Sequence, residues 1–271
     1  MSSALAKALS VLEYMVQHPL GCPVSDIAQA LDLPVSGVHR LLKELEKSGY
    51  VNQTRGMGDY QLTIKLASLG LSYLGQTGIP NISQPILDAL AQESRELVRL
   101  ALADGDTLVW VGVAQGASGG LRYDPGSEQG QVVHLASSAG GQAWLAAMSD
   151  DEAIALALKQ GLLKPQTPGD TAPGSVADLL AILNTVRQRG YSLNANSFLQ
   201  GMAAMATVVR DPDTRMPIGT VSIAGPAARL TPDLMESHAE ALLAAAQALG
   251  EASRASGYFS RHHVAATRNI A

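Results

Sequence analysis

The chain has 271 residues, of which 46% are apolar, and it carries a formal net charge of −5. This length is typical of two domains, and the negative charge argues against a protein that coats nucleic acid or anionic lipid through bulk charge. No apolar run approaches the roughly 18 residues of a membrane span, and the first residues lack the features of a signal peptide. We therefore expect a cytoplasmic protein without a membrane partner.

The first predicted element is a helix over residues 4–17. Its apolar residues recur at helical spacing and predict one stripe that faces a core. The members of this stripe are Leu5, Leu9, Leu12 and Val16. The segment 18–21 contains a proline and a glycine and is expected to end the helix.

Two short helices are predicted to follow. Ser25 is a candidate cap for the second helix, with Asp26 favourable in its first turn. The segment 32–34, Asp-Leu-Pro, breaks that helix, and a third helix is expected from about 35 to 48, closed by a glycine. The tight turn, with the small Ala28 where the two helices meet, indicates a helix-turn-helix.

The third helix divides into an apolar face and a polar face. Val38, Leu41, Leu42 and Leu45 are expected to point inward, and Glu44 and Glu46 to turn away from DNA. Arginine can read guanine with two hydrogen bonds, whereas serine and lysine can hold phosphates. The candidate DNA-binding residues on the outer face are Ser36, Gly37, His39, Arg40 and Lys43.

A hairpin is expected after the third helix. Short strands at 50–51 and 60–62 flank a glycine-bearing loop, which is typical of the wing of a winged helix, and Arg55 at its tip is a further DNA-binding candidate. Residues 1–63 carry five Lys/Arg against six Asp/Glu, a net charge of −1. DNA affinity would therefore depend on a few well-placed cations and on more than one copy of the domain. From these residues alone, a protein–protein module stays an alternative.

The rest of the chain alternates hairpins and helices, which indicates an antiparallel sheet flanked by helices in an α+β sensor domain. Ser83, Ser175 and Thr231 are candidate helix caps. We expect strands at about 97–103, 107–114, 119–123, 131–135, 202–210 and 217–224, and helices at about 83–93, 140–148, 151–160, 175–189 and 231–249.

These elements suggest four parts of the chain. We expect a winged helix-turn-helix over 1–63, a linker helix over 64–80, an effector-binding domain over 81–257 and a flexible tail over 258–271. The linker helix is the candidate lever between the two domains.

Signals for catalysis and metal binding are weak. Residues 116–120 match G-x-S-x-G, but strand and turn are expected after them where a nucleophile elbow needs a helix, so a hydrolase using Ser118 is a remote alternative. The single cysteine, Cys22, excludes a disulfide within the chain and a cysteine-based zinc site, and His238 has no partner at metal-ligand spacing. We therefore expect no catalytic residue, no metal and no cofactor.

Several segments resemble the IclR family of bacterial transcriptional regulators, in order and over essentially the whole chain. They are ALAKALSVL at 4–12, LPVSGVHRLL at 33–42, ASSAGGQAWLA at 136–146, GMAAMA at 201–206 and IGTVSIAGP at 218–226. The resemblance implies a regulator rather than an enzyme, with double-stranded operator DNA as its partner. It also implies a GAF-like effector domain and assembly as a dimer or tetramer. An effector acts by favouring one arrangement of the DNA-binding domains.

The resemblance also implies an effector site. Backbone amides of Ala139 and Gly140, where small residues open a helix, would hold a ligand carboxylate, as helix N-termini do. The other implied effector-binding positions are Asn194, Ala204, Ser222 and Ala224. Three of these four depart from the acid, cysteine and second serine that we associate with binders of small keto acids. The smaller, less polar set favours a larger organic acid, and we hypothesise an aromatic one.

Alternatives stay open for the second domain. Arg122, Tyr123 and His134 precede the small-residue helix and would face either the effector or solvent. A sensor module that acts only through protein partners would also explain the low charge, and it would show no salt-dependent affinity for DNA.

Overall fold

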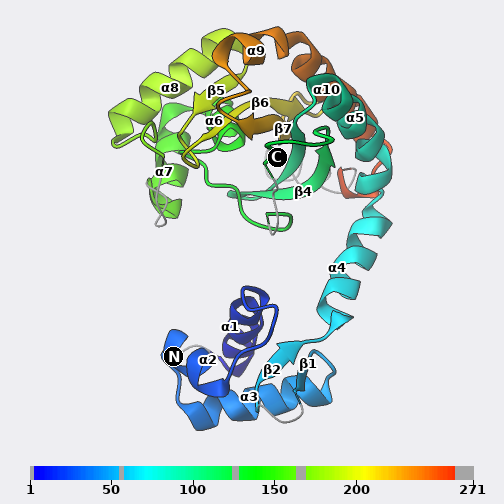
Figure 1. The fold of residues 1–271 in the computed structure, drawn as a ribbon, viewed down its shortest axis with the longest axis vertical. Coiled ribbons are helices and arrows are strands. Elements are labelled where there is room, and N and C mark those ends of the chain that lie inside the picture. The colour runs from blue at the N-terminus through cyan, green and yellow to red at the C-terminus, as the bar shows by residue number, and fades with distance from the viewer. Residues whose placement is uncertain (1–2, 55–57, 124–127, 163–168, 260–271) are drawn as a thin grey trace, which may run out of the picture. The chain divides into compact units, whose positions relative to one another are not determined.

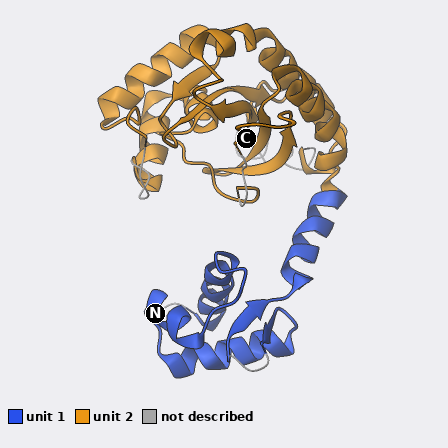
Figure 2. Cartoon of the chain, viewed as in Figure 1, with its two compact units in different colours: residues 1–76 blue, residues 77–271 orange. Residues whose placement is uncertain are grey.

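The computed structural model describes residues 3–54, 58–123, 128–162 and 169–259 (Figure 1). The chain divides into two compact units, residues 1–76 and residues 77–271 (Figure 2). This division falls near the end of the helix that we expected as a linker, so most of that helix belongs to the first unit.

The first unit is a winged helix-turn-helix followed by a helix. Three helices pack on a two-stranded antiparallel hairpin in which Val51 pairs with Leu62. Its buried core includes Val11, Met15, Ile27, Val38, Leu42 and Tyr60. The elements are α1 (Ala4–Val16), α2 (Val24–Ala30), α3 (Val35–Lys47), β1 (Val51–Gln53), β2 (Tyr60–Leu62) and α4 (Ile64–Thr77).

The predicted apolar stripe of α1 is wrong for three of its four members. Leu5, Leu9 and Val16 are 70%, 50% and 49% exposed, and the helix instead buries Val11 and Met15 beside Leu12. The helix is apolar on more than one side, so its periodicity does not decide which side meets the core. The exposed side is left without a covering element within the first unit as described.

The turn of the helix-turn-helix forms as expected, although its caps differ. Asp32 adopts the left-handed conformation (φ 50°), and Pro34 in extended conformation precedes the first residue of α3. The Ser25 cap is wrong: the cap residue is Pro23, two residues earlier, and the Ser25 hydroxyl donates to the Asp26 carboxylate at 3.0 Å.

The second unit is built on an antiparallel sheet. Among the described residues, five strands form this sheet in the order β4-β3-β7-β6-β5. The strands are β3 (Leu97–Asp104), β4 (Thr107–Gln115), β5 (Ser192–Ala195), β6 (Met202–Arg210) and β7 (Pro217–Pro226). The helices are α5 (Ile79–Ser94), α6 (Ala139–Ala146), α7 (Asp150–Gln160), α8 (Val176–Arg189), α9 (Pro232–Ser237) and α10 (Ala239–Ser253).

Helices cover both faces of this sheet (Figure 1). One face packs against α5 and α10 through a core that includes Leu100, Met205 and Ile223. The opposite face carries α6, which packs on Ala204 and Ala206 through Ala139 and Ala143. Alternate residues of each strand therefore belong to different cores, as the pleat of a strand requires.

Two predicted strands and one predicted cap are wrong. The described parts of 119–123 and 131–135 form no strand, apart from an isolated bridge between Val132 and Val109. Ser83 lies inside α5, where its hydroxyl donates to the Ile79 carbonyl oxygen, because the helix begins directly after Gly78 in the left-handed conformation (φ 75°).

The caps of two later helices are confirmed. The Ser175 and Thr231 side chains accept from the amides of Asp178 and Leu234. The single helix expected over 231–249 is instead two helices that meet at His238. In the segment expected as a tail, Tyr258 and Phe259 pack on the core, and residues 260–271 lie outside the described part of the chain.

Candidate DNA-binding and effector-binding sites

The outer face of α3 offers one unpaired cation. Ser36, His39 and Arg40 are exposed, and Gly37 is half-buried. Arg40 forms no ion pair or hydrogen bond with any residue that the structure describes, so its guanidinium is available to a ligand. A Cβ atom added to Gly37 would lie no closer than 4.0 Å to its nearest neighbour, the Pro34 Cβ, so packing does not require a glycine there.

Lys43 is held within the protein instead of extending freely. Its Nζ donates to Glu46 Oε2 at 2.9 Å and to Gln53 Oε1 at 3.5 Å, and it lies 5.6 Å from the centre of the Tyr60 ring. The hydrogen bond to Glu46 is the main cause that raises the pKa of Lys43 and lowers the pKa of Glu46. Lys43 thus ties α3 to the hairpin, and a phosphate contact would compete with Glu46.

Two lysines of this unit that were not DNA-binding candidates also have partners, and one candidate, Arg55, is left to place. Lys47 pairs with Glu44 at 2.8 Å on an exposed part of α3. Lys65 donates to the Ser48 carbonyl oxygen at 2.6 Å and so satisfies the C-terminal end of α3. Arg55 lies outside the described residues.

Strand register places the expected effector residues on one face of the sheet. Asn194 pairs with Ala204, which pairs with Ala224, so these three lie side by side across β5, β6 and β7. Ser222 lies two residues along β7 on the same face, opposite Ala206. This is the face that α6 covers.

The start of α6 lies on the same face. The Ser138 side chain accepts from the Gly141 amide at 3.0 Å, while the amides of Ala139 and Gly140 donate to no residue in the described part of the chain. Asn194 reaches α6 through its Nδ2, which donates to Gln142 Oε1 at 3.1 Å. The structure thus brings the six expected effector positions together, around free amides at a helix N-terminus.

The three residues left open by the sequence have different environments. Arg122 is exposed. His134 is buried and locked: its Nε2 donates to the Gly161 carbonyl oxygen at 3.0 Å, and its Nδ1 lies 2.8 Å from the Ser137 hydroxyl. The hydroxyl of Tyr123 donates to the carboxylate of Glu128.

Sequence reasoning missed a buried arginine on the face of the sheet that α6 covers. Arg99 pairs with Ser222 in the β3–β7 register and is only 7% exposed. Its NH1 contacts Glu128 Oε2 at 2.5 Å. Arg99 could have been identified from the sequence as a charged residue inside an otherwise apolar strand. Because a buried charge requires a partner, such a residue indicates an ion pair or a polar site.

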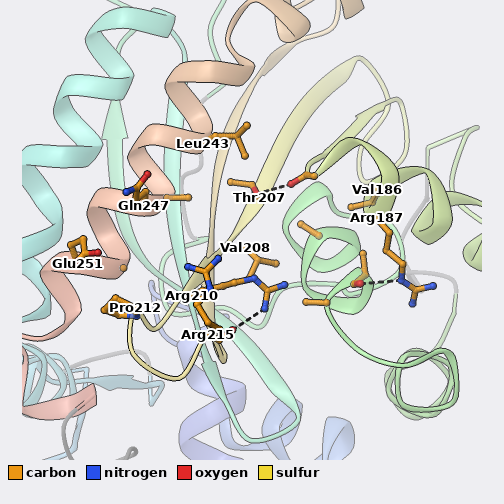
Figure 3. Close-up of a pocket in the computed structure, with 16 residues that line it drawn as sticks. Val186, Arg187, Thr207, Val208, Arg210, Pro212, Arg215, Leu243, Gln247 and Glu251 are labelled. Atoms are coloured by element: carbon orange, nitrogen blue, oxygen red, sulfur yellow. Dashed lines mark hydrogen bonds between the residues drawn. The ribbon is translucent and has the colours of Figure 1, made fainter.

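A separate pocket of about 440 Å³ lies elsewhere on the second unit, between α6, α8, β6 and α10 (Figure 3). It runs along β6 beyond Ala206, where β5 no longer pairs, and none of the expected effector residues lines it. Arg187 at its edge donates to two carbonyl oxygens and to Asp150, and Arg210 NH1 donates to the Arg215 carbonyl oxygen (Figure 3). Burial lowers the pKa of Arg210.

The structure gives the hydrolase alternative no support. Ser118 is exposed in the loop after β4 and forms no hydrogen bond with a residue that the structure describes. In the described ranges, no three His, Cys, Asp or Glu side chains gather as metal ligands. None of the described helices is both long and apolar enough to cross a membrane.

A winged helix joined to a helix-covered antiparallel sheet defines the class: a DNA-binding transcriptional regulator with an effector-binding domain. The sequence model described as "Bacterial transcriptional regulator IclR C-terminal" matches residues 71–251, and that of the "IclR helix-turn-helix domain" matches residues 4–55. The chain belongs to the IclR family.

Curated relatives and solved structures agree with this assignment. The HTH-type transcriptional repressor AllR of Klebsiella pneumoniae is 29% identical over 242 residues, which cover 88% of this chain and 85% of AllR. The crystal structure of Thermotoga maritima IclR is 27% identical, with a TM-score of 0.67, over 91% of this chain and 97% of that one. An IclR homologue from Microbacterium hydrocarbonoxydans, crystallised with 4-hydroxybenzoate, has the same fold at 20% identity (TM-score 0.76; 93% and 100% covered).

Proposed function

We propose that this regulator reads operator DNA through α3 and the hairpin, and that an aromatic organic acid bound on the α6 face of the sheet controls this binding. The observation that carries the effector part of this proposal is that the amides of Ala139 and Gly140, at the start of α6 on that face, donate to no residue that the structure describes. These amides offer an anion-binding site beside the small side chains of Ala204 and Ala224.

For DNA, the support is the exposed polar face of α3. Arg40 is the cation that carries base recognition, because no residue in the described ranges takes up its guanidinium donors. Gly37 admits close approach of the DNA backbone, Ser36 and His39 add polar contacts at the same end of α3, and Lys43 and Arg55 contribute phosphate contacts.

For the effector, the support is the size and polarity of the expected wall. Ala204 and Ala224 present short side chains without polar groups, which suits a planar apolar ring with one acidic end. The 4-hydroxybenzoate bound by the Microbacterium hydrocarbonoxydans homologue is an acid of this kind.

We propose further that the protein works as a dimer or a dimer of dimers. Exposed apolar side chains at helical spacing, such as Leu5 and Leu9 on α1, form a surface that a second copy can cover. Further exposed apolar residues on α4 are Ile64, Leu69, Leu71 and Tyr73. Two recognition helices read two half-sites, which compensates for the weak charge of each domain.

The test is binding of the purified protein to the DNA upstream of its own gene, measured by fluorescence anisotropy at several salt concentrations beside a scrambled duplex. We expect preference for the upstream DNA, weakening as salt rises. The variant Arg40→Ala should lose about 1–3 kcal/mol of binding free energy and some sequence preference, whereas Lys47→Ala, which removes a paired cation of the same helix, should change little.

A module that acts only through protein partners is the competing function. It predicts equal and weak binding to both duplexes at low salt, with and without aromatic acids. That result would reject the proposed role of α3.

A further inference from the structure

We propose that Arg99 is an anion-binding residue of the effector site, and that Glu128 occupies its binding position until the carboxylate of an aromatic acid takes that position. This inference rests on the proposed function, because it assumes an acidic effector on the α6 face. It names a residue and an exchange that the family resemblance does not supply.

Arg99 lies on the same face of the sheet as the expected effector residues and directly beside one of them. Its register partner on β7 is Ser222, whose own partner on β6 is Ala206, under α6. The Arg99 side chain is 8% exposed, and that of Glu128 is 12% exposed. A positive charge is therefore buried on the face where the ligand is expected.

The hydrogen-bonding capacity of Arg99 is only partly used. A guanidinium presents a planar fork that matches both oxygens of one carboxylate. Glu128 does not fill this fork: its Oε2 meets Arg99 NH1, but its Oε1 accepts from the Tyr123 hydroxyl. The Nε of Arg99 is buried and has no hydrogen-bond partner among the residues that the structure describes. A ligand carboxylate that approaches Nε can therefore make a contact that Glu128 does not make.

A second ion pair, with a buried carboxylate and a partly exposed arginine, shows a guanidinium that binds both oxygens of its partner. Arg229 binds both oxygens of Glu96, with Nε to Oε1 at 2.5 Å and NH2 to Oε2 at 2.7 Å. Glu96 lies against Gly225, which alternates with Ala224 along β7 and therefore faces the other side of the sheet. This pair is a matched control outside the proposed site.

Aromatic side chains surround Arg99. Its guanidinium carbon lies 4.7 Å from the centre of the Trp110 ring and 5.9 Å from that of Tyr123, and Phe198 packs edge-on against Trp110. One of the two tryptophans and one of the two phenylalanines of the chain therefore lie at this place. An aromatic acid can pack its ring against this surface while its carboxylate meets Arg99.

When one carboxylate replaces another beside Arg99, the buried positive charge stays compensated. A buried cation that loses its partner is strongly destabilised, whereas a cation that changes partner keeps its charge compensated. The ligand therefore competes with Glu128, so removing the Glu128 charge should strengthen binding and removing the Arg99 charge should weaken it.

The test is isothermal titration of benzoate and 4-hydroxybenzoate into the full-length wild-type protein, Glu128→Gln, Arg99→Gln and Glu96→Gln. We expect Glu128→Gln to tighten binding by about tenfold or more and Arg99→Gln to weaken it by at least about tenfold. Glu96→Gln should bind as the wild type does. Thermal unfolding without ligand checks that each variant is folded, and Glu128→Gln tests the inference if Arg99→Gln does not fold.

The experiment distinguishes failure of the proposed role of Arg99 from failure of the proposed control of DNA binding by an acidic effector. If the acids bind and shift DNA affinity but all variants bind them equally, Arg99 has no such role while the effector proposal stands. If the acids bind with the expected variant pattern but leave DNA affinity unchanged, the anion site stands and the control of DNA binding fails. If neither the wild type nor Glu128→Gln binds either acid, the inference is overturned.

Discussion

Lys43 and Glu46 form an ion pair, with Nζ 2.9 Å from Oε2, on the helix that we expect to enter the DNA groove. Both side chains are partly exposed. Lys43 was predicted from the sequence to contact a DNA phosphate, but it is paired with the Glu46 carboxylate instead. Glu46 also adds a negative charge to the face of α3 that is proposed to meet DNA.

Replacing Glu46 by glutamine should therefore strengthen DNA binding. The change frees the Lys43 ammonium and removes a repulsive charge, so we expect tighter binding and a log–log salt slope that steepens by about 1. Anisotropy titrations at several salt concentrations measure both. Glu44→Gln, which frees the exposed Lys47, is the control, and an equal effect of the two changes would contradict a special role for Lys43.

Replacing Gly37 by alanine should separate stability from function. The site has room for a Cβ atom, so the change should stabilise the folded protein by about 0.5–1 kcal/mol, because a glycine inside a helix is unfavourable. DNA affinity should fall, because the methyl group occupies space at the groove. Urea unfolding and anisotropy measure the two effects.

The matched control for that prediction is Gly70→Ala on α4, where an added Cβ also meets no atom within 4 Å. It should stabilise the protein similarly. Unchanged DNA affinity in Gly37→Ala would show that DNA does not approach this position closely.

Replacing Leu9 by glutamate should weaken self-association with little loss of monomer stability. Leu9 is 50% exposed on α1, so a charge there disturbs the proposed contact between copies more than the fold. Sedimentation velocity should show a shift toward smaller species, and affinity for two-half-site DNA should fall by at least about tenfold. Leu20→Glu, at a residue 94% exposed outside α1, should leave association unchanged.

Alkaline pH should destabilise the first unit through Cys22. Burial, followed by the charges of Asp26 and Asp59, raises the pKa of this thiol above its ordinary value of 9.0. Its contribution to the free energy of unfolding is therefore complete below that value and is lost as pH rises through the folded-state pKa, because the unfolded chain releases the proton first. Urea unfolding at about pH 7 and about pH 10 should show a smaller loss for Cys22→Ala than for the wild type.

Local signals in the sequence determined much of the fold. The break at Asp32 to Pro34 and the caps at Ser175 and Thr231 each act within a few residues, so the pattern alone located the helix-turn-helix and two later helices. The strands expected at about 97–103 and 107–114 likewise form, as the hairpin of β3 and β4 around Gly105.

The tertiary structure decided what depends on a partner far along the chain. Of two expected strands, 119–123 pairs with no described strand, and 131–135 meets β4 only at the isolated bridge between Val132 and Val109, so neither extends into a strand. The exposed side of α1 is a similar case, since both of its sides are apolar and only packing selects one.

The residues of the candidate sites also divide into those that the sequence predicted and those that only the structure shows. The polar face of α3 follows from helical spacing, whereas the pairing of Arg99 with Glu128, 29 residues apart, follows from neither spacing nor propensity. The sequence by itself determined local turns, caps and periodicities, because these arise from neighbouring residues. Only the tertiary structure decided which faces are buried and which charges meet, because burial and ion pairing depend on segments that the fold brings together.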